Sequence, residues 1–322
     1  MTIDNHLQSQ SALFNASEVT LVPNIKGSSV KSLINIVAAS IVLSACNPVS
    51  PTSKQAEPSP LQHVNLPAGT LAVVIDGNSP DPDDIGATPV LLALLDKANA
   101  SERLVHISHS CDLDPFRNKA RYQIDPKNES RRQRVLDSSI NRALNVFGPF
   151  ENTEKLFNCR TEQQGAIEDL TIAINRATAE RPLWIIEAGE PDVIGYALRK
   201  SEVSKRQYVK VVSHHPANDN SGDFFTWQQI LDFGVEEHQI GDQNVGLQTP
   251  ISAWDWAKDS EDEGISLIYE MLEYAEQDGI VPFQAGKFDS SDAGMIYWWI
   301  TGADNGGNKK ATTHDIEATL LH

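Results

Sequence analysis

The acidic segment at residues 76–84 holds the side chains best suited to chemistry. It reads Asp-Gly-Asn-Ser-Pro-Asp-Pro-Asp-Asp and places four carboxylates and one amide within nine residues. Carboxylates packed so closely repel one another unless something offsets their charge. A hard cation with oxygen ligands would do so, and Ca²⁺ is the natural candidate. A structural interpretation stays open, because Asp83 could cap a helix that begins here and the helix dipole favours negative charge at that end.

The elements around this segment can be predicted from hydrophobic periodicity. Residues 71–75 form a continuous apolar run that ends at the acidic segment and is typical of a strand buried on both faces. Similar runs predict three more strands, and apolar residues at helical spacing predict helices between and after them. The strands are expected at 103–107, 183–186 and 209–212, and the helices at 85–98, 131–147, 166–177, 192–199, 265–275 and 293–301.

Strands that alternate with helices predict an α/β fold, with a mostly parallel sheet and helices on both faces. Ligands of such sheets bind beyond the carboxyl ends of the strands. The acidic segment follows the first strand at such an end. A ligand site is therefore expected around it.

Polar residues also follow the third and fourth strands, at the same expected edge of the sheet. Glu187 and Glu190 follow the third strand, and His214, His215 and Asn218 follow the fourth. We expect Glu187, His214, His215 and Asn218 to contact a substrate. Two alternatives remain: Glu187 could pair with a buried arginine, and the histidines could face water.

Three other groups of residues have weaker functional interpretations. His106 and His109 end the second strand, but their spacing matches no strong zinc pattern, so pocket lining or surface is the better prediction. Trp254 and Trp256 could stack on sugar faces, although large aromatics are more often core. Cys111 and Cys159 could form a disulfide in an oxidising compartment or remain buried thiols.

The N-terminal region carries the pattern of an export signal. An apolar run at residues 33–43 follows two lysines and is short for a membrane span. It leads into Leu-Ser-Ala-Cys, which resembles the lipobox of bacterial lipoproteins, in which the cysteine is lipidated and becomes the new N-terminus. The sequence therefore predicts a signal peptide at 1–45, lipidation at Cys46 and an exported protein anchored to the cell membrane. The alternative is an uncleaved anchor helix.

The remainder of the chain divides into a linker and one domain. Residues 46–69 are rich in proline and polar residues, which is typical of an extended linker. Residues 70–322 are long enough for a single α/β domain. The net charge of −18 argues against nucleic acid as a partner, because an acidic surface repels phosphates.

The Asp-Pro-Asp-Asp run after the first strand resembles the nucleoside-hydrolase-like superfamily. It is most similar to a branch of secreted proteins described as cellulose-binding. Other segments agree in order, and together they extend the resemblance over residues 71–302. These segments are Arg-Pro-Leu-Trp at 181–184, the polar loop at 212–222 and Ser-Asp-Ala-Gly at 291–294.

The resemblance implies roles for individual residues. Asp76 would be the general base acting on a calcium-bound water and a ligand of the ion, with Asp84 and Asp292 as further ligands. Asp83 would bind sugar hydroxyls. The segment is one residue longer than the family motif, so Asp81 could also serve as a ligand. The residues expected to hold Ca²⁺ are thus Asp76, Asp81, Asp84 and Asp292.

Two positions depart from the family pattern. Asn78 stands where the family fingerprint has its second aspartate, and we expect it to contact the substrate. Ser291 stands where nucleoside-cleaving members have a histidine that helps the base to leave, which argues against ordinary purine-nucleoside hydrolysis.

Three functions are compatible with this sequence. The leading hypothesis is a calcium-dependent hydrolase of an N- or O-glycosidic bond, acting outside the cytoplasm on a sugar-containing small molecule or glycan. The second is a lipoprotein that binds carbohydrate in the same pocket without catalysis. The third is a calcium-stabilised structural lipoprotein.

Overall fold

A parallel sheet forms the centre of the fold in the computed structural model. The model describes residues 66–77, 83–114, 126–153, 155–277, 287–302 and 310–322. Within these residues, six parallel strands pair in the order β3-β2-β1-β4-β5-β6. The strands are β1 (Thr70–Ile75), β2 (Leu104–His109), β3 (Leu156–Asn158), β4 (Leu183–Ala188), β5 (Val209–Ser213) and β6 (Glu236–Gln239).

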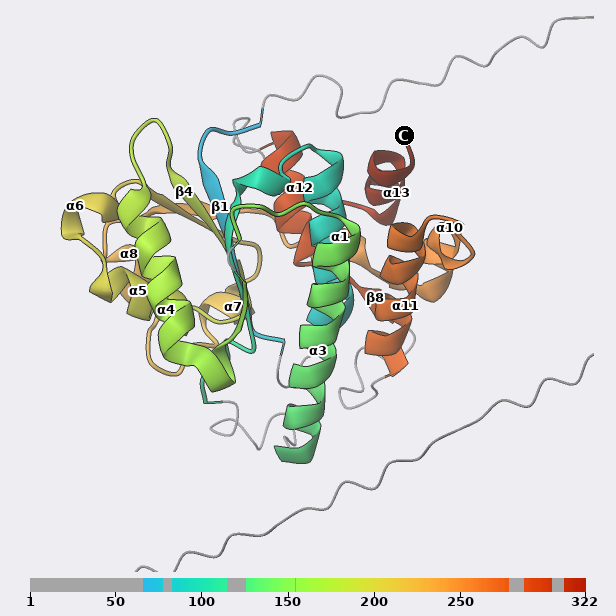
Figure 1. Ribbon diagram of the computed structural model, residues 1–322, viewed down its shortest axis with the longest axis horizontal. Helices are drawn as coiled ribbons and strands as arrows, with labels where there is room; N and C mark the ends of the chain where they lie inside the picture. Colours follow the sequence, from blue (N-terminus) through green and yellow to red (C-terminus); the bar gives the residue numbers. More distant parts are fainter. Residues whose placement is uncertain (1–65, 78–82, 115–125, 154, 278–286, 303–309) are drawn as a thin grey trace, which may run out of the picture. The chain divides into compact units, whose positions relative to one another are not determined.

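Helices cover both faces of this sheet (Figure 1). One side carries α1 (Asp84–Lys97), α3 (Pro126–Val146), α11 (Glu263–Gln277), α12 (Ala293–Gly302) and α13 (Thr313–Leu321). The other side carries α4 (Cys159–Arg176), α5 (Asp192–Lys200), α6 (Val203–Arg206) and α8 (Trp227–Leu231). Shorter helices are α7 (Pro216–Asp219), α9 (Asn244–Leu247) and α10 (Asp255–Lys258), and the short strands β7 (Gln248–Pro250) and β8 (Lys287–Asp289) pair antiparallel.

The alternation of side chains along β1 explains why both faces are covered. Leu71, Val73 and Ile75 belong to the apolar core beneath α1, α3 and α12. Ala72 and Val74 belong to the core beneath α4 and α5. Because successive side chains of a strand point to opposite faces, an uninterrupted apolar run needs a helical layer on each side. The predicted α/β architecture is confirmed.

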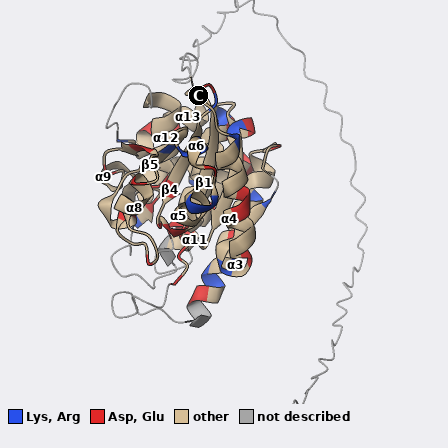
Figure 2. Cartoon of the chain, turned by 90° about the vertical axis from the view of Figure 1, so that its left-hand side faces the viewer, with Lys and Arg blue, Asp and Glu red and all other residues tan. Residues whose placement is uncertain are grey.

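The outer helices carry the charges. Figure 2 shows both basic and acidic residues along α3. One exposed pair joins two helices of this side: Arg142 on α3 donates two hydrogen bonds of 2.8 Å each to the carboxylate of Glu270 on α11. Among the described residues, no helix is long and apolar enough to cross a membrane.

The strand order creates a switch point at β1. This strand pairs with β2 on one side and β4 on the other. The chain therefore adds β2 and β3 on one side of β1, and β4, β5 and β6 on the other. At the carboxyl end of β1 the Asp76 amide donates to the Ala188 carbonyl at 2.9 Å, and the Cys111 amide donates to the Ile75 carbonyl at 3.0 Å. The loops after β1, β2 and β4 therefore meet here, which is where open α/β sheets bind ligands.

Some elements differ from the sequence-based expectation. Helix α4 begins at Cys159 rather than 166, because the Asn158 side chain caps it by accepting from the Arg160 amide at 3.0 Å. Strand β6 was not predicted, since its sequence Glu-Glu-His-Gln has no apolar residue and its side chains are mostly exposed. It is an edge strand of the sheet, and its pairing with β5 is made by the backbone.

Cys111 and Cys159 are both buried free thiols, so the disulfide alternative is not formed. Trp254 is fully buried core, as its more common role predicts. The signal peptide, Cys46 and most of the 46–69 linker lie outside the described residues.

Candidate active site

Asp76 stands at the switch point, directly after β1. Its Oδ1 accepts a hydrogen bond of 2.6 Å from the Gly77 amide, and its side chain is partly exposed. Gly189, directly after β4, packs against the carboxyl group with φ at +123°. A Cβ on Gly189 would lie 2.0 Å from Asp76 Cγ, so only glycine permits this approach.

Asp83 and Asp84 lie at the N-terminus of α1. Asp83 Oδ1 caps the helix by accepting from the Asp84 amide at 3.0 Å, which the structural interpretation of the sequence anticipated. Asp84 itself is buried, and its Oδ2 accepts from the Gly77 amide at 3.0 Å. One backbone amide thus lies between the carboxyl groups of Asp76 and Asp84 and holds them close together.

Asp292 reaches the same place from a distant part of the chain, just before α12. Its Oδ1 lies 3.0 Å from Nε2 of His214, the first residue after β5. The Gln243 amide donates to His214 Nδ1 at 3.3 Å, so Nδ1 is an acceptor. Nε2 therefore carries the hydrogen and donates it in the hydrogen bond to Asp292. His214 therefore orients Asp292.

The electrostatics of this cluster follow from burial. The pKa of Asp84 is raised well above its usual value, first by burial and then by the negative charges of Asp292, Asp83 and Asp76. The carboxyl groups of Asp84 and Asp292 also lie within hydrogen-bonding reach of each other. Two carboxyls can share such a bond only if one is protonated, or they can share a cation instead.

Glu187 is the most isolated acid of the site. It lies in β4 with no exposed surface, and neither of its carboxylate oxygens has a hydrogen-bond partner among the described residues. The expected alternative of a buried arginine partner is therefore wrong within that part of the chain. The nearby Ser213 hydroxyl does not satisfy it, because this hydroxyl donates to Asp219 Oδ1 at 2.5 Å. Burial, followed by the charge of Asp219, raises the Glu187 pKa well above its usual value.

Two further acids border the switch point beside the predicted cluster. Glu190 follows β4 and Asp112 follows β2, and both are almost fully buried. Burial, followed by the charges of Asp112 and Asp76, raises the Glu190 pKa to about 11. Burial, followed by the charge of Asp76, raises the Asp112 pKa to about 8. The sequence signal for both residues was their position after a predicted strand.

The structure brings together some of the predicted residues and not others. Asp76, Asp83, Asp84, Asp292, Glu187 and His214 meet at the carboxyl ends of β1, β4 and β5. His215 instead caps α7, where its Nδ1 accepts from the Ala217 amide at 3.0 Å. Asn218 lies in α7 and makes no hydrogen bond to the acidic cluster among the described residues. Asn78 and Asp81 lie outside the described residues.

The two histidines of β2 are buried, so the surface interpretation is wrong for them. His106 lies 2.6 Å from Asp169 and 2.9 Å from the Ser108 hydroxyl. His109 lies 3.0 Å from the Ser110 hydroxyl and 3.4 Å from Asp137.

The acidic cluster fits a hard divalent cation in the type and charge of its donors. Asp84, Asp292 and Asp76 offer only carboxylate oxygens, which Ca²⁺ prefers. A cation would also offset the mutual repulsion that raises the Asp84 pKa. Among the described residues, no group of three or more His, Cys, Asp or Glu side chains is arranged to hold a metal ion.

Comparison with known proteins gives one sequence relative and one structural likeness. No protein-family model matches the chain. The chain is similar to the solved structure of a plant nucleoside hydrolase, the PpNRh1 enzyme, with 10% identity, a TM-score of 0.49, and coverage of 73% of this chain and 79% of the other. It is 49% identical over 257 residues to "Uncharacterized protein P22" of Formosa agariphila, covering 80% of this chain and 92% of the relative. The chain therefore belongs to the same protein family as P22 of Formosa agariphila.

Proposed function

We propose that this protein is a calcium-dependent hydrolase of a glycosidic bond in a sugar-containing small molecule. The observation that carries the proposal is the meeting of Asp76 and Asp84, from the acidic segment, with the distant Asp292 at the sheet's switch point. The resemblance of the acidic segment to the nucleoside-hydrolase-like superfamily, and to its secreted branch, supports the same conclusion. Asp76 is partly exposed and Asp84 is buried. This difference supports Asp76 as the general base that meets water and Asp84 as a ligand of the ion.

In this mechanism Asp76 takes the proton of a water whose oxygen bonds to the anomeric carbon, while the glycosidic bond breaks and its electron pair leaves with the leaving group. Asp84 and Asp292, with Asp76, would hold the calcium ion, which when bound lowers the pKa of a water and orients it. His214 keeps Asp292 in place through its Nε2–H.

Two acids would bind the sugar in this mechanism. Burial raises the pKa of Glu187, which favours its protonated form, and this form can donate a hydrogen bond to a sugar hydroxyl. Asp83 accepts from another hydroxyl while it caps α1.

Ser291 favours a second candidate function, carbohydrate binding without turnover. Its side chain is buried, and its amide donates to Asp289 Oδ1 at 3.0 Å, so this position holds no acid that could protonate a leaving group. A ribosylated or glycosylated compound that stabilises the protein without being cleaved would favour binding over hydrolysis.

Calcium binding is tested by thermal unfolding of the chain from residue 47 onward, first with EDTA and then with excess Ca²⁺. Calcium at about 100 times its dissociation constant should add about 2.7 kcal/mol to the free energy of unfolding. For a domain of this size that shifts the midpoint by several degrees. Asp84→Asn should abolish the shift, because the ion loses a charged ligand.

The exposed Asp259 on the surface supplies the matched control for this experiment. Asp259→Asn removes the same charge and should leave the calcium shift intact. If calcium shifts the midpoint of Asp84→Asn as much as that of the unmodified chain, the acidic cluster is not the calcium site. If calcium does not shift the midpoint of the unmodified chain, the protein is not calcium-dependent.

We also propose that the protein is exported and anchored through a lipid on Cys46. The support is the order of lysines, apolar run and Leu-Ser-Ala-Cys in residues 26–46. Cys46→Ala should abolish incorporation of a labelled fatty acid in a bacterial host. Label retained in this variant would show that the cleavage site is assigned wrongly.

A further inference from the structure

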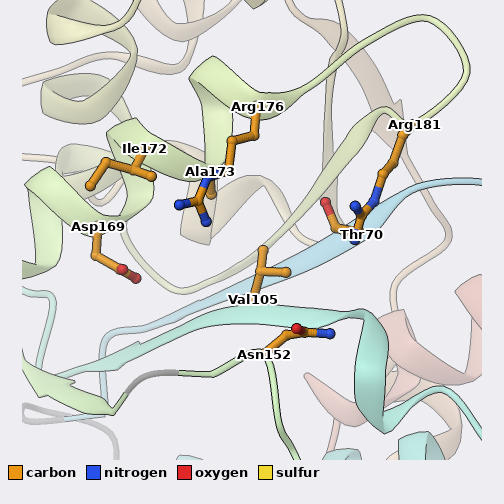
Figure 3. Close-up of a pocket in the computed structure, with 8 residues that line it drawn as sticks. All are labelled: Thr70, Val105, Asn152, Asp169, Ile172, Ala173, Arg176 and Arg181. Atoms are coloured by element: carbon orange, nitrogen blue, oxygen red, sulfur yellow. The ribbon is translucent and has the colours of Figure 1, made fainter.

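A pocket lies at the amino ends of the parallel strands, whereas the acidic cluster lies at their carboxyl ends. It has a volume of about 180 Å³ and opens at the amino ends of β1, β2 and β4 (Figure 3). Thr70 begins β1, Val105 is the second residue of β2, and Arg181 lies two residues before β4. The last turns of α4 form another wall.

Two arginines line this pocket without partners. Arg176 is the last residue of α4, and Arg181 follows in the loop to β4. Neither guanidinium makes a hydrogen bond or an ion pair with any residue in the described part of the chain. In the view of Figure 3 the two guanidinium groups lie on either side of Val105. Two cationic side chains without partners that line one pocket favour an anionic ligand.

Asp169, the acidic residue of the same pocket, already has a hydrogen-bond partner. Asp169 Oδ2 lies 2.6 Å from Nδ1 of the fully buried His106, which holds the carboxylate toward the sheet. The arginines therefore remain the uncommitted charged groups among the described lining residues. Two arginines without an acidic partner are notable in a chain whose net charge is −18, because acidic side chains outnumber basic ones.

Apart from Thr70 and Asn152, the rest of the lining is apolar and limits the size of the ligand. Val105, Ala173 and Ile172 contribute hydrocarbon surface, and the Ile172 side chain is exposed. The volume is comparable with engineered cavities of roughly 150 Å³ that accept a benzene ring. The pocket thus suits an anionic head attached to a small apolar body.

We propose that this pocket binds a compact organic oxyanion, a carboxylate or a phosphate monoester, with Arg176 and Arg181 as its donors. Guanidinium groups match the geometry of both head groups through paired N–H donors. The Thr70 side chain also lines the pocket and supplies a hydroxyl donor. The site is independent of the acidic cluster, because it lies at the other ends of the strands.

The test measures ligand binding to the full chain by calorimetry at low ionic strength, where exposed charges are least screened. Benzoate and phenyl phosphate should bind saturably, whereas benzyl alcohol, which lacks the charge, should not. Arg176→Gln and Arg181→Gln should each weaken binding by about tenfold or more, since hydrogen bonds to a charged group are lost. Both side chains are exposed, so these variants should keep the melting temperature of the ligand-free protein.

Arg134 on α3 provides the matched control, because it is exposed and does not line the pocket. Arg134→Gln should leave binding unchanged. Inorganic phosphate should bind more weakly than phenyl phosphate, because it cannot use the apolar wall. Equal binding of benzyl alcohol, equal weakening in Arg134→Gln, or undiminished binding in the Arg176→Gln/Arg181→Gln double variant would each overturn the proposal.

Discussion

Asp76→Asn is expected to lower kcat/KM for glycosidic hydrolysis by about 10²- to 10⁴-fold, the usual contribution of a general base. An amide cannot take a proton from water at neutral pH. Asparagine keeps an oxygen that can accept from the Gly77 amide, so the local backbone should be retained. The measurement is the release of p-nitrophenol from p-nitrophenyl glycosides, or of base from nucleosides, at saturating Ca²⁺.

The specificity of this effect depends on two comparisons. Asp259→Asn, an exposed change of the same charge, should leave kcat/KM unchanged. Thermal unfolding of Asp76→Asn should show a folded protein, so that lost activity is not lost structure. A folded Asp76→Asn variant with full activity would rule out Asp76 as the base.

The stability of the metal-free protein is expected to fall as the pH rises from about 5 to 8. The pKa of Glu190 is raised to about 11 and that of Asp112 to about 8, so both stay protonated in the fold where the unfolded chain is ionised. Their stabilisation is complete below their unfolded pKa values, near 4. It is lost as the pH rises, at up to roughly 1.4 kcal/mol per pH unit for each group. The loss from Asp112 ends near pH 8, whereas that from Glu190 continues toward pH 11.

Thermal midpoints in EDTA across this pH range test the expectation. Glu190→Gln should flatten the decline, because a glutamine imitates the protonated acid and does not titrate. Glu151→Gln, at an exposed position, should leave the slope of the unmodified protein. A Glu190→Gln variant with the same slope would show that Glu190 ionises in the fold as it does in water.

Much of the architecture could be predicted from local pattern. Apolar runs at 71–75, 183–186 and 209–212 predicted buried strands, and each lies within an observed strand. This works because a strand buried on both faces must be apolar throughout, and the requirement is visible in any short window. Elements that are stabilised by backbone pairing or by a helix cap, and not by apolar burial, were not predicted. The polar β6 pairs through its backbone at an edge, and the start of α4 depends on the Asn158 cap.

The acidic segment could likewise be recognised from its sequence, but the composition of the site could not. Four carboxylates directly after a buried strand are a local feature, and so is the capping role of Asp83. Whether Glu187 would find an arginine or remain unpaired depends on which side chains pack around it. The structure shows a fully buried carboxyl group without a partner in the described part of the chain.

The order of the strands depends on long-range pairing, which no local pattern encodes. Because β4, and not β3, pairs with β1, Gly189 packs against the Asp76 carboxyl group. Because α12 packs across α1, Asp292 reaches both Asp84 and His214, which is 78 residues away along the chain. Sequence periodicity thus determined that strands and helices alternate and that acids follow the first strand. Tertiary packing decided which acids meet, since contacts between distant segments depend on the burial of whole faces and not on the residues next to them.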